Sequence, residues 1–385
     1  MDKAGVFLLL KVMTIVGTRP ELIRLSRTIA RLDATVKHVL VHTGQNYDFS
    51  LNEVFFKDLD IREPDYMLGV DTSSLGRVLG ETLIRTEDVL RAENPDAVLV
   101  LGDTNSCIAA VMAKRLRIPV YHMEAGNRCF DENVPEETNR RMVDHVADFN
   151  LVYTEHARRN LLAEGIHPRR ILLTGSPMRE VLEAYRPSID SSQVLGDLGL
   201  EDGRYFLVSA HREENVDSPE RLRMLLDALL AVRDKWGLRV LVSTHPRTRK
   251  RLEALSNWVE PDGLVFHEPF GFHDYNRLQL GAACVLSDSG TIAEESSILG
   301  FPAVTLRDSI ERPEALDTGS IIMTGLHSED VVDAIGEVME DVEHRAPHLP
   351  GGYEVSDTSS RVVRFIMSTA RRHHSWAGIR LNEHK

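Results

Sequence analysis

The sequence predicts an α/β protein with two Rossmann-like domains, each built around a parallel sheet. Short apolar runs alternate with longer amphipathic segments, which is the pattern of strands joined by crossover helices. The alternation runs through the first half of the chain and restarts in the second half. A length of 385 residues also exceeds what one hydrophobic core usually supports. We therefore expect an N-terminal domain at 1–184 and a C-terminal domain at 185–352.

The first half contains six apolar runs typical of buried strands. The segment 6–16 includes Lys11 and lacks a small-residue cleavage site, so we interpret it as a first strand rather than a signal sequence. A helix is expected to end near Ala113. The other expected elements are strands at 11–16, 38–42, 97–101, 120–123, 151–153 and 171–174, and helices at 21–32 and 82–93.

The second half follows a predicted linker at 185–203, which contains Pro187 and several Ser and Asp residues. Helical periodicity returns at 355–372. Ligands of parallel sheets bind at the carboxyl ends of strands, so the loops after the strands are the candidate site. The expected elements are strands at 205–209, 239–243, 264–267, 282–286 and 302–306, and helices at 220–235 and 275–281.

Composition limits the possible partners. A formal net charge of −14 argues against nucleic acid, whose phosphates need a basic surface. No apolar run approaches the length of a membrane span. The three cysteines, Cys107, Cys129 and Cys284, have no metal-ligand spacing, so we expect core thiols in a reducing cytoplasm and no bound metal.

Two glycine-containing loops have the features of anion sites. The apolar run 282–286 leads into Ser289-Gly290-Thr291 and then a helix, whose N-terminal amides favour a phosphate. Glu294 and Glu295, one turn later, are within expected reach of ribose hydroxyls. Near the N-terminus, Arg19 follows a Gly-Thr turn, and its guanidinium suits a diphosphate, although it could simply fix the loop. Together these loops favour a nucleotide-linked substrate held across a cleft between the domains.

Three carboxylates form a second predicted cluster. Asp103 and Glu124 each follow a strand, and Glu136 begins a helix. Acids brought together in a desolvated site separate in pKa and supply one proton donor and one acceptor. Helix capping by Asp103 and first-turn charge at Glu136 are the structural alternatives.

His211 and His245 follow strands of the second half. Their spacing does not suit zinc, so hydrogen bonding to phosphate or sugar, or acid–base work, fits them better. The chain has neither a nicotinamide-binding G-x-G-x-x-G after its first strand nor a P-loop. We therefore expect neither a dehydrogenase nor an NTPase.

Taken together, these loops resemble those of the non-hydrolysing UDP-N-acetylglucosamine 2-epimerases. The resemblance covers most of the chain, because the motifs occur in family order from residue 11 to about 325. The matching pieces are Gly17-Thr18-Arg19-Pro20-Glu21, Thr43-Gly44-Gln45, Gly102-Asp103-Thr104, Glu124-Ala125-Gly126, Pro135-Glu136-Glu137 with Asn139-Arg140, His211-Arg212, Asp288-Ser289-Gly290 with Glu294-Glu295, and Glu311-Arg312-Pro313-Glu314.

The resemblance implies a glycosyltransferase-B fold, with a return helix within 353–385 that rejoins the N-terminal domain. It implies inversion at C2 of a UDP-N-acetylhexosamine through elimination of UDP to a glycal and re-addition, without a cofactor. A homodimer is also implied. The implied catalytic residues are Asp103, Glu124, Glu136 and His211, and the implied substrate or UDP-binding residues are Arg19, Arg24, Arg140, His245, Arg247, Tyr275, Ser289, Gly290, Glu295 and Arg312.

Within the family, four stretches are more similar to one branch, the UDP-N-acetyl-L-fucosamine synthases of capsule and O-antigen synthesis. These enzymes epimerise UDP-2-acetamido-2,6-dideoxy-L-talose. The stretches are 42–48, 124–131, 243–249 and 272–278. The alternatives are a UDP-GlcNAc/UDP-ManNAc 2-epimerase, a hydrolysing epimerase, a UDP-sugar glycosyltransferase of the same fold, and a non-catalytic nucleotide-sugar sensor.

Overall fold

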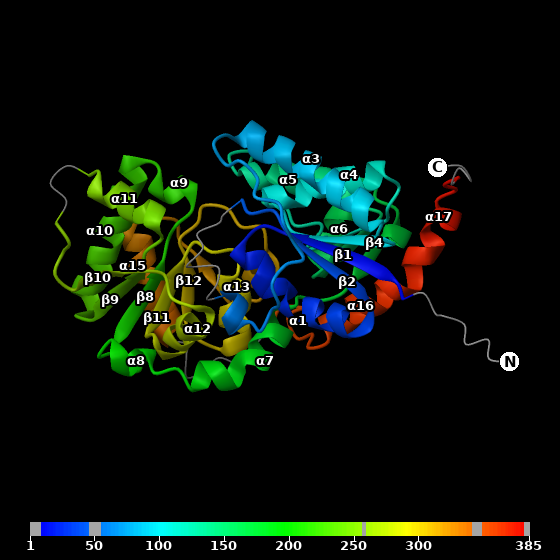
Figure 1. Ribbon diagram of the computed structural model, residues 1–385. Coiled ribbons are helices and arrows are strands. Elements are labelled where there is room, and N and C mark those ends of the chain that lie inside the picture. Colours follow the sequence, from blue (N-terminus) through cyan, green and yellow to red (C-terminus); the bar gives the residue numbers. More distant parts are fainter. Residues whose placement is uncertain (1–8, 46–54, 256–258, 341–348, 381–385) are drawn as a thin grey trace. The chain divides into compact units, whose positions relative to one another are not determined.

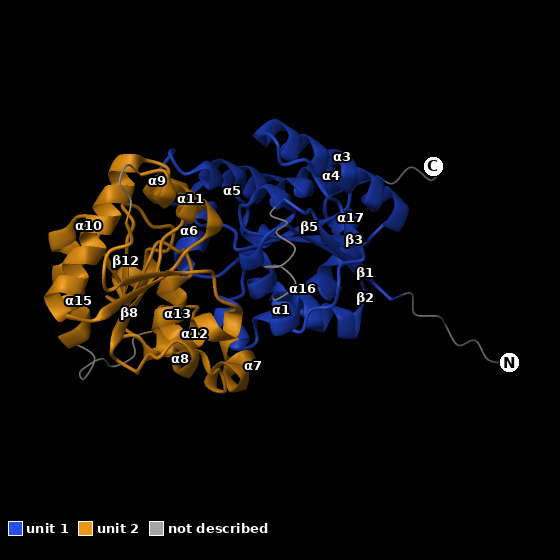
Figure 2. Cartoon of the chain, turned by 60° about the vertical axis from the view of Figure 1, so that its left-hand side comes forward, with its two compact units in different colours: residues 1–181, 355–385 blue, residues 182–354 orange. Residues whose placement is uncertain are grey.

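The computed structural model describes residues 9–45, 55–255, 259–340 and 349–380 (Figure 1). It divides into two compact units, the first comprising residues 1–181 and 355–385 and the second residues 182–354 (Figure 2). The boundary falls inside helix α7, Met178–Asp190, a few residues before the expected position. Residues 381–385 of the expected return segment lie outside the described residues.

Unit 1 is built on a seven-stranded sheet in the order β3-β2-β1-β4-β5-β6-β7. Each strand pairs with its neighbours in parallel. Parallel pairing requires a crossover after each strand, which explains the alternation with helices. The strands are β1 Lys11–Val16, β2 Lys37–His42, β3 Tyr66–Met67, β4 Ala97–Leu101, β5 Val120–Met123, β6 Phe149–Val152 and β7 Ile171–Leu173.

Two helical layers cover this sheet. Apolar residues on one face pack with α3 Leu75–Glu93, α4 Ala109–Arg115 and α5 Pro135–Val146. On the other face, α1 Arg19–Thr35 lies beside α16 Thr358–Thr369 (Figure 1). The remaining helical segments of unit 1 are η1 Asn105–Ile108, α6 Glu155–Ala163, η2 Pro168–Arg170, η4 Ala370–Arg372 and α17 His373–Trp376.

Helix α16 joins unit 1 from the far end of the chain. Ser359 N donates to Glu180 Oε2 at 2.8 Å, and Tyr121 OH and Thr369 Oγ1 lie 2.6 Å apart. The ring of Phe365 meets Phe149 edge-on at 5.2 Å between centroids. Helix α16 thus contributes to the core of unit 1 from the far end of the chain.

Unit 2 contains a second parallel sheet, of six strands in the order β10-β9-β8-β11-β12-β13. One face packs with α10 Pro219–Trp236 and α15 Ser328–Glu340, and the other with α8 Val194–Asp197, α12 Phe272–Gly281 and α13 Ile292–Leu299. The strands are β8 Tyr205–Ser209, β9 Arg239–Ser243, β10 Leu264–His267, β11 Cys284–Ser287, β12 Ala303–Thr305 and β13 Ile322–Met323. The other helices are α9 Glu213–Val216, α11 Pro246–Glu253 and α14 Glu314–Asp317.

The predicted linker at 185–203 is wrong. Helix α7 continues through Pro187 to Asp190, and α8 follows at once. Pro187 lies in the last turn of α7, while Ile189, Val194 and Leu195 are buried. Burial of these side chains outweighs the polar composition that suggested a linker. The helix expected at 82–93 also begins earlier, at Leu75, where Ser74 caps it by accepting from Arg77 N.

Candidate active site

The loops after β4 and β5 of unit 1 carry two of the predicted acid–base residues, Asp103 and Glu124, and α5 carries the third, Glu136. Gly102 and Gly126 have φ values of +67° and +82°, and Glu124 itself has φ of 64°. Left-handed backbone costs a non-glycine residue about 1 kcal/mol or more. Such strain persists only where surrounding contacts hold it, and it marks Glu124 as a residue whose position is constrained.

Asp103 is held by helix α5. Arg140 donates to Asp103 Oδ2 from Nε at 3.0 Å and from Nη2 at 2.6 Å. Asn139 Nδ2 donates to the Asp103 carbonyl at 2.9 Å. Arg140 is buried, whereas the Asp103 side chain keeps about a fifth of its surface exposed. The carboxylate is therefore fixed in direction while one side remains accessible.

Glu124 is held in a similar way by helix α1. Its Oε2 accepts from Nη1 of the buried Arg24. Both candidate acids thus pair with a buried arginine, one from each helical layer. Each guanidinium fixes the direction of the carboxylate that it contacts. Arg24 and Arg140, expected to bind substrate, therefore contact the candidate acids.

Glu136 and its neighbour Glu137 differ in environment. Glu137 is buried and accepts from Arg140 Nη1 at 2.8 Å and from Cys129 N at 3.2 Å. Burial acts to raise the pKa of Glu137, but these bonds and the Arg140 charge outweigh it and lower the pKa. Glu136 is half-buried in the first turn of α5. The side chain that organises the helix start is thus Glu137, and Glu136 is the more accessible of the two.

The loop after β1 is shaped around a buried carboxylate. Glu21 accepts from Gly17 N at 3.0 Å, Thr18 Oγ1 at 2.8 Å and Ser106 Oγ at 2.5 Å. Burial raises its pKa. Arg19 leaves this loop and lies over the Phe55 ring, 5.4 Å from its centroid.

In unit 2, Asp288 organises the loop that carries His211. Its fully buried carboxylate accepts from the backbone N–H of His211 and of Arg212, each at 3.0 Å, and from Asn215 Nδ2 at 3.0 Å. The His211 ring is left 47% exposed, with Nδ1 3.6 Å from Asp288 Oδ1. His245 lies beside it, at 6.4 Å between ring centroids. Two adjacent imidazoles are therefore presented at the carboxyl ends of β8 and β9.

The predicted anion site follows β11. Ser289 Oγ accepts from Thr291 N at 3.3 Å, just before α13 begins. A Cβ at Gly290 would stand 2.7 Å from Glu311 Oε1, so a side chain there would require Glu311 to shift. Glu311 also accepts from Arg212 at 3.3 Å and pairs with the buried Arg307.

Glu294 corrects one expectation. It is fully buried and pairs with Arg312 Nη1 at 2.7 Å, so it is not available to ribose hydroxyls. Helical spacing turns it inward, whereas Glu295 is half-exposed and accepts from Gln279 Nε2 at 2.6 Å. Burial acts to lower the pKa of the Arg312 guanidinium, but the negative charge of Glu294 outweighs it and the pKa is raised.

The remaining predicted binding residues lie in unit 2. Arg247 pairs with Glu213 and Asp217, so it joins the start of α11 to α9. Tyr275 is on α12 and packs against the apolar core with part of its side chain. Burial raises its pKa and keeps the phenol protonated at neutral pH.

Unit 1 also contains a buried polar network that was not predicted from the sequence. It consists of His122 on β5, Asp144 on α5 and Arg128 in the loop between them, all 2% exposed or less. A histidine inside an otherwise apolar strand was the available signal. Asp144 lies four residues after Arg140, and therefore on the same helix face.

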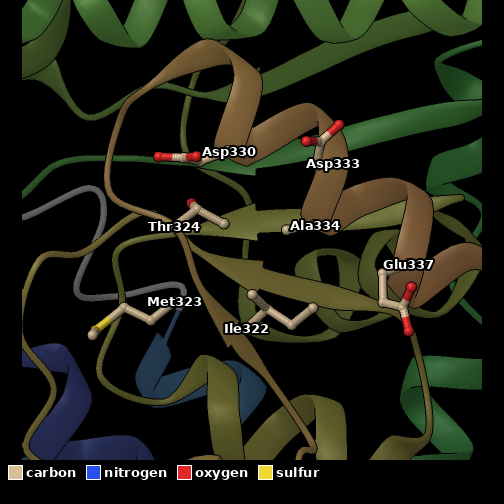
Figure 3. Close-up of a pocket in the computed structure, with 7 residues that line it drawn as sticks. All are labelled: Ile322, Met323, Thr324, Asp330, Asp333, Ala334 and Glu337. Carbon is tan, nitrogen blue, oxygen red and sulfur yellow. The ribbon is translucent and has the colours of Figure 1, made fainter.

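The described parts of the chain contain neither a His/Cys/Asp/Glu group suited to a metal ion nor a helix able to span a membrane. A surface pocket of unit 2 lies between β13 and α15 (Figure 3). Its polar lining is acidic, and it does not suit a diphosphate. The lining residues are Ile322, Met323, Thr324, Asp330, Asp333, Ala334 and Glu337.

Comparison with solved structures places this fold among known enzymes. A structure of UDP-N-acetylglucosamine 2-epimerase from Rickettsia bellii is 44% identical, with a TM-score of 0.90, over 97% of this chain and 100% of that one. The structure of the Methanocaldococcus jannaschii UDP-GlcNAc 2-epimerase in complex with UDP-GlcNAc and UDP is 33% identical, with a TM-score of 0.86. The match covers 93% of this chain and 100% of that one. A glycosyltransferase from Rickettsia africae shares only the fold, at 10% identity and a TM-score of 0.58. The chain is thus an α/β enzyme of glycosyltransferase-B type.

Sequence comparison identifies the family. The family model described as UDP-N-acetylglucosamine 2-epimerase matches residues 30–367. The Methanocaldococcus jannaschii UDP-N-acetylglucosamine 2-epimerase is 36% identical over 93% of this chain and 99% of its own length. A Pseudomonas aeruginosa UDP-2,3-diacetamido-2,3-dideoxy-D-glucuronate 2-epimerase is 33% identical over the same shares. The chain belongs to the UDP-N-acetylglucosamine 2-epimerase family and is an isomerase.

Proposed function

We propose that this protein inverts C2 of a UDP-N-acetylhexosamine without hydrolysing it. The C2 proton is removed and the C1–O bond to UDP breaks, which leaves a glycal. UDP then adds back to C1 while a proton returns to the opposite face of C2. The observation that carries the proposal is that Asp103 and Glu124, on adjacent strand ends, are each held by a buried arginine in a chain of 2-epimerase type.

In this proposal the residues of the two units have different roles. In unit 1, Asp103, Glu124 and Glu136 exchange the carbon-bound proton, since positioned carboxylates act as general acid and base. In unit 2, His211, Ser289 and Gly290 stabilise the charge that develops on the departing diphosphate, with Arg19 of unit 1 as a further ligand. Further contacts to the nucleotide and sugar come from Glu295, Tyr275, His245 and Arg247, while Arg312 orders the loop beside them.

We propose UDP-2-acetamido-2,6-dideoxy-L-talose as the substrate, with UDP-N-acetyl-L-fucosamine as the product for surface polysaccharide. The four branch-like stretches support this choice; residues 46–48 of the first lie outside the described residues. UDP-GlcNAc is the alternative, favoured by the names of the relatives. The talose derivative is an L sugar and lacks the C6 hydroxyl of UDP-GlcNAc, and a site that hydrogen-bonds a hydroxyl rejects an analogue lacking it.

An assay in deuterated water tests reaction and substrate together. Each UDP-sugar is incubated separately with the protein and followed by NMR. We expect the 6-deoxy substrate to turn over faster and its product to carry deuterium at C2. Product without solvent label would exclude the proton-transfer mechanism, and release of free N-acetylhexosamine would identify a hydrolysing enzyme. Faster turnover of UDP-GlcNAc would overturn the substrate assignment.

We also propose a cytoplasmic homodimer. The three cysteines are free thiols, and two of them are buried, which suits a reducing compartment. The dimer is an expectation from the family. Sedimentation of the purified protein at several concentrations tests it, and a monomer at micromolar concentration would refute it.

A further inference from the structure

The buried network of His122, Asp144 and Arg128 connects the two loops that carry the candidate acids. His122 Nε2 lies 2.7 Å from the carbonyl oxygen of Gly102, the residue before Asp103. His122 Nδ1 lies 2.9 Å from Asp144 Oδ1. Both neighbours are hydrogen-bond acceptors, and the ring lies between them within hydrogen-bonding distance of each. The ring therefore joins the end of β4 to helix α5.

Asp144 extends the connection to the other loop. Its carboxylate accepts from Gly126 N, at 3.2 Å to Oδ1 and 3.1 Å to Oδ2, two residues after Glu124. Arg128 Nη1 donates to Asp144 Oδ2 at 2.8 Å. Arg128 is itself fixed by Glu164, which accepts from Nε and Nη2 at 2.7 Å each. The negative charge on Asp144 is thus compensated and its orientation is set.

Helix α5 supplies residues that contact both loops. Arg140, one turn before Asp144, grips the Asp103 carboxylate directly. Asn139 holds the Asp103 carbonyl. The helix therefore contacts the Asp103 side chain and backbone through Arg140 and Asn139. Through Asp144 it contacts the Gly126 loop directly and the Gly102 loop by way of His122.

We propose that His122 and Asp144 are positioning residues that set the separation and direction of Asp103 and Glu124. This inference rests on the proposed function, since it assigns the network to proton transfer at C2. Displacement of a catalytic group by about 1 Å can cost about 10²-fold in rate. Neither His122 nor Asp144 is exposed, so neither touches substrate.

A second buried His–Asp pair in the same unit supplies a matched control. His373 Nε2 lies 2.7 Å from Asp148 Oδ1 and is also buried. Asp148 immediately precedes β6 and accepts from Val120 N, so this pair lies at the amino-terminal edge of the sheet. Its loss should reduce stability without changing the geometry at the carboxyl ends.

The experiment compares wild type, His122→Asn, His122→Gln and His373→Asn. For each, kcat and KM are measured with the UDP-sugar, together with UDP affinity by calorimetry and Tm. We expect His122→Asn to lower kcat about 10²-fold, with KM and UDP affinity unchanged. The amide of Gln can reach the Gly102 carbonyl, so His122→Gln should recover part of kcat. His373→Asn should keep wild-type kcat despite a lowered Tm.

Three results would overturn the proposal: wild-type kcat in His122→Asn, an equal loss of kcat in His373→Asn, or failure of both His122 variants to fold while His373→Asn folds. The last would make the network structural. Absence of C2 exchange in the wild type refutes the proposed function instead, so the two failures are distinguishable.

Discussion

At the scale of single residues, the two candidate acids are held in the same way. Asp103 and Glu124 each accept from a buried arginine, and Glu124 adopts a left-handed backbone. The residue types were predictable because short polar loops follow apolar strands. Their partners were not: Arg24 and Arg140 were expected on the substrate, and Glu294 on the ribose. Helix phase, which sequence gives only approximately, decides which side chains turn inward.

Replacing either acid should stop catalysis and spare UDP binding. Asp103→Asn or Glu124→Gln removes a positioned proton-transfer group, and we expect kcat to fall by about 10²–10⁴-fold. Steady-state kinetics and calorimetry with UDP measure the two effects. Glu87→Gln, on the outer surface of α3, is the control and should be fully active. Wild-type turnover in either acid variant would remove that residue from the mechanism.

Stability should depend on the protonation of His42. Burial lowers its pKa from 6.5 to about 4, and Nδ1 accepts from Gly44 N. Between pH 4 and 6.5 the unfolded chain therefore binds more protons at His42 than the folded chain does. The stabilisation that comes from neutral His42 is complete above pH 6.5 and is lost as the pH falls toward 4. The difference corresponds to about 3 kcal/mol. Urea unfolding of wild type and His42→Gln across this range tests it; parallel pH curves would contradict it.

At the scale of elements, the loop between β1 and α1 depends on close approach. A Cβ at Gly17 would lie 2.4 Å from Thr43 Oγ1 and 2.9 Å from Ser106 Cβ. The Gly-Thr turn was visible in the sequence, but the neighbours that a side chain would meet come from the residue after β2 and from the segment after β4. Only the parallel pairing of β1 with both strands brings them there.

Gly17→Ala should therefore destabilise the protein by about 1–3 kcal/mol, as overpacked sites do. Gly80→Ala is the control, because Gly80 lies within α3 and a Cβ there meets nothing within 4 Å. Helix propensity favours that second change by up to about 1 kcal/mol. Denaturant midpoints of the two variants should move in opposite directions. A Gly17→Ala protein as stable as wild type would show that the loop adjusts.

At the scale of the whole molecule, the chain forms two parallel-sheet units, and helix α16, near the end of the chain, returns to the first unit. Ile366 on α16 is fully buried, whereas Met367 beside it is 49% exposed. The amphipathic pattern at 355–372 predicted a helix, and the family resemblance predicted the unit it joins. Apolar periodicity by itself shows that a face must be buried but not against what.

Ile366→Ala tests this role of α16. Deletion of a buried branched side chain costs about 2–5 kcal/mol, and unit 1 should lose that stability. Met367→Ala should change stability by less than about 0.5 kcal/mol, as exposed positions do. Thermal unfolding of both variants gives the comparison. Equal effects at the two positions would mean that the helix does not pack on unit 1 as described.

The sequence alone determined the class of fold and the family, because strand–helix periodicity and loop motifs are local properties of the chain. It also located the acids at strand ends, since parallel sheets place those ends on one edge. Tertiary structure alone decided the partners: Arg24 with Glu124, Arg140 with Asp103, and His122 between Gly102 and Asp144. Those pairings join residues up to a hundred positions apart, and they depend on packing geometry that no local pattern encodes.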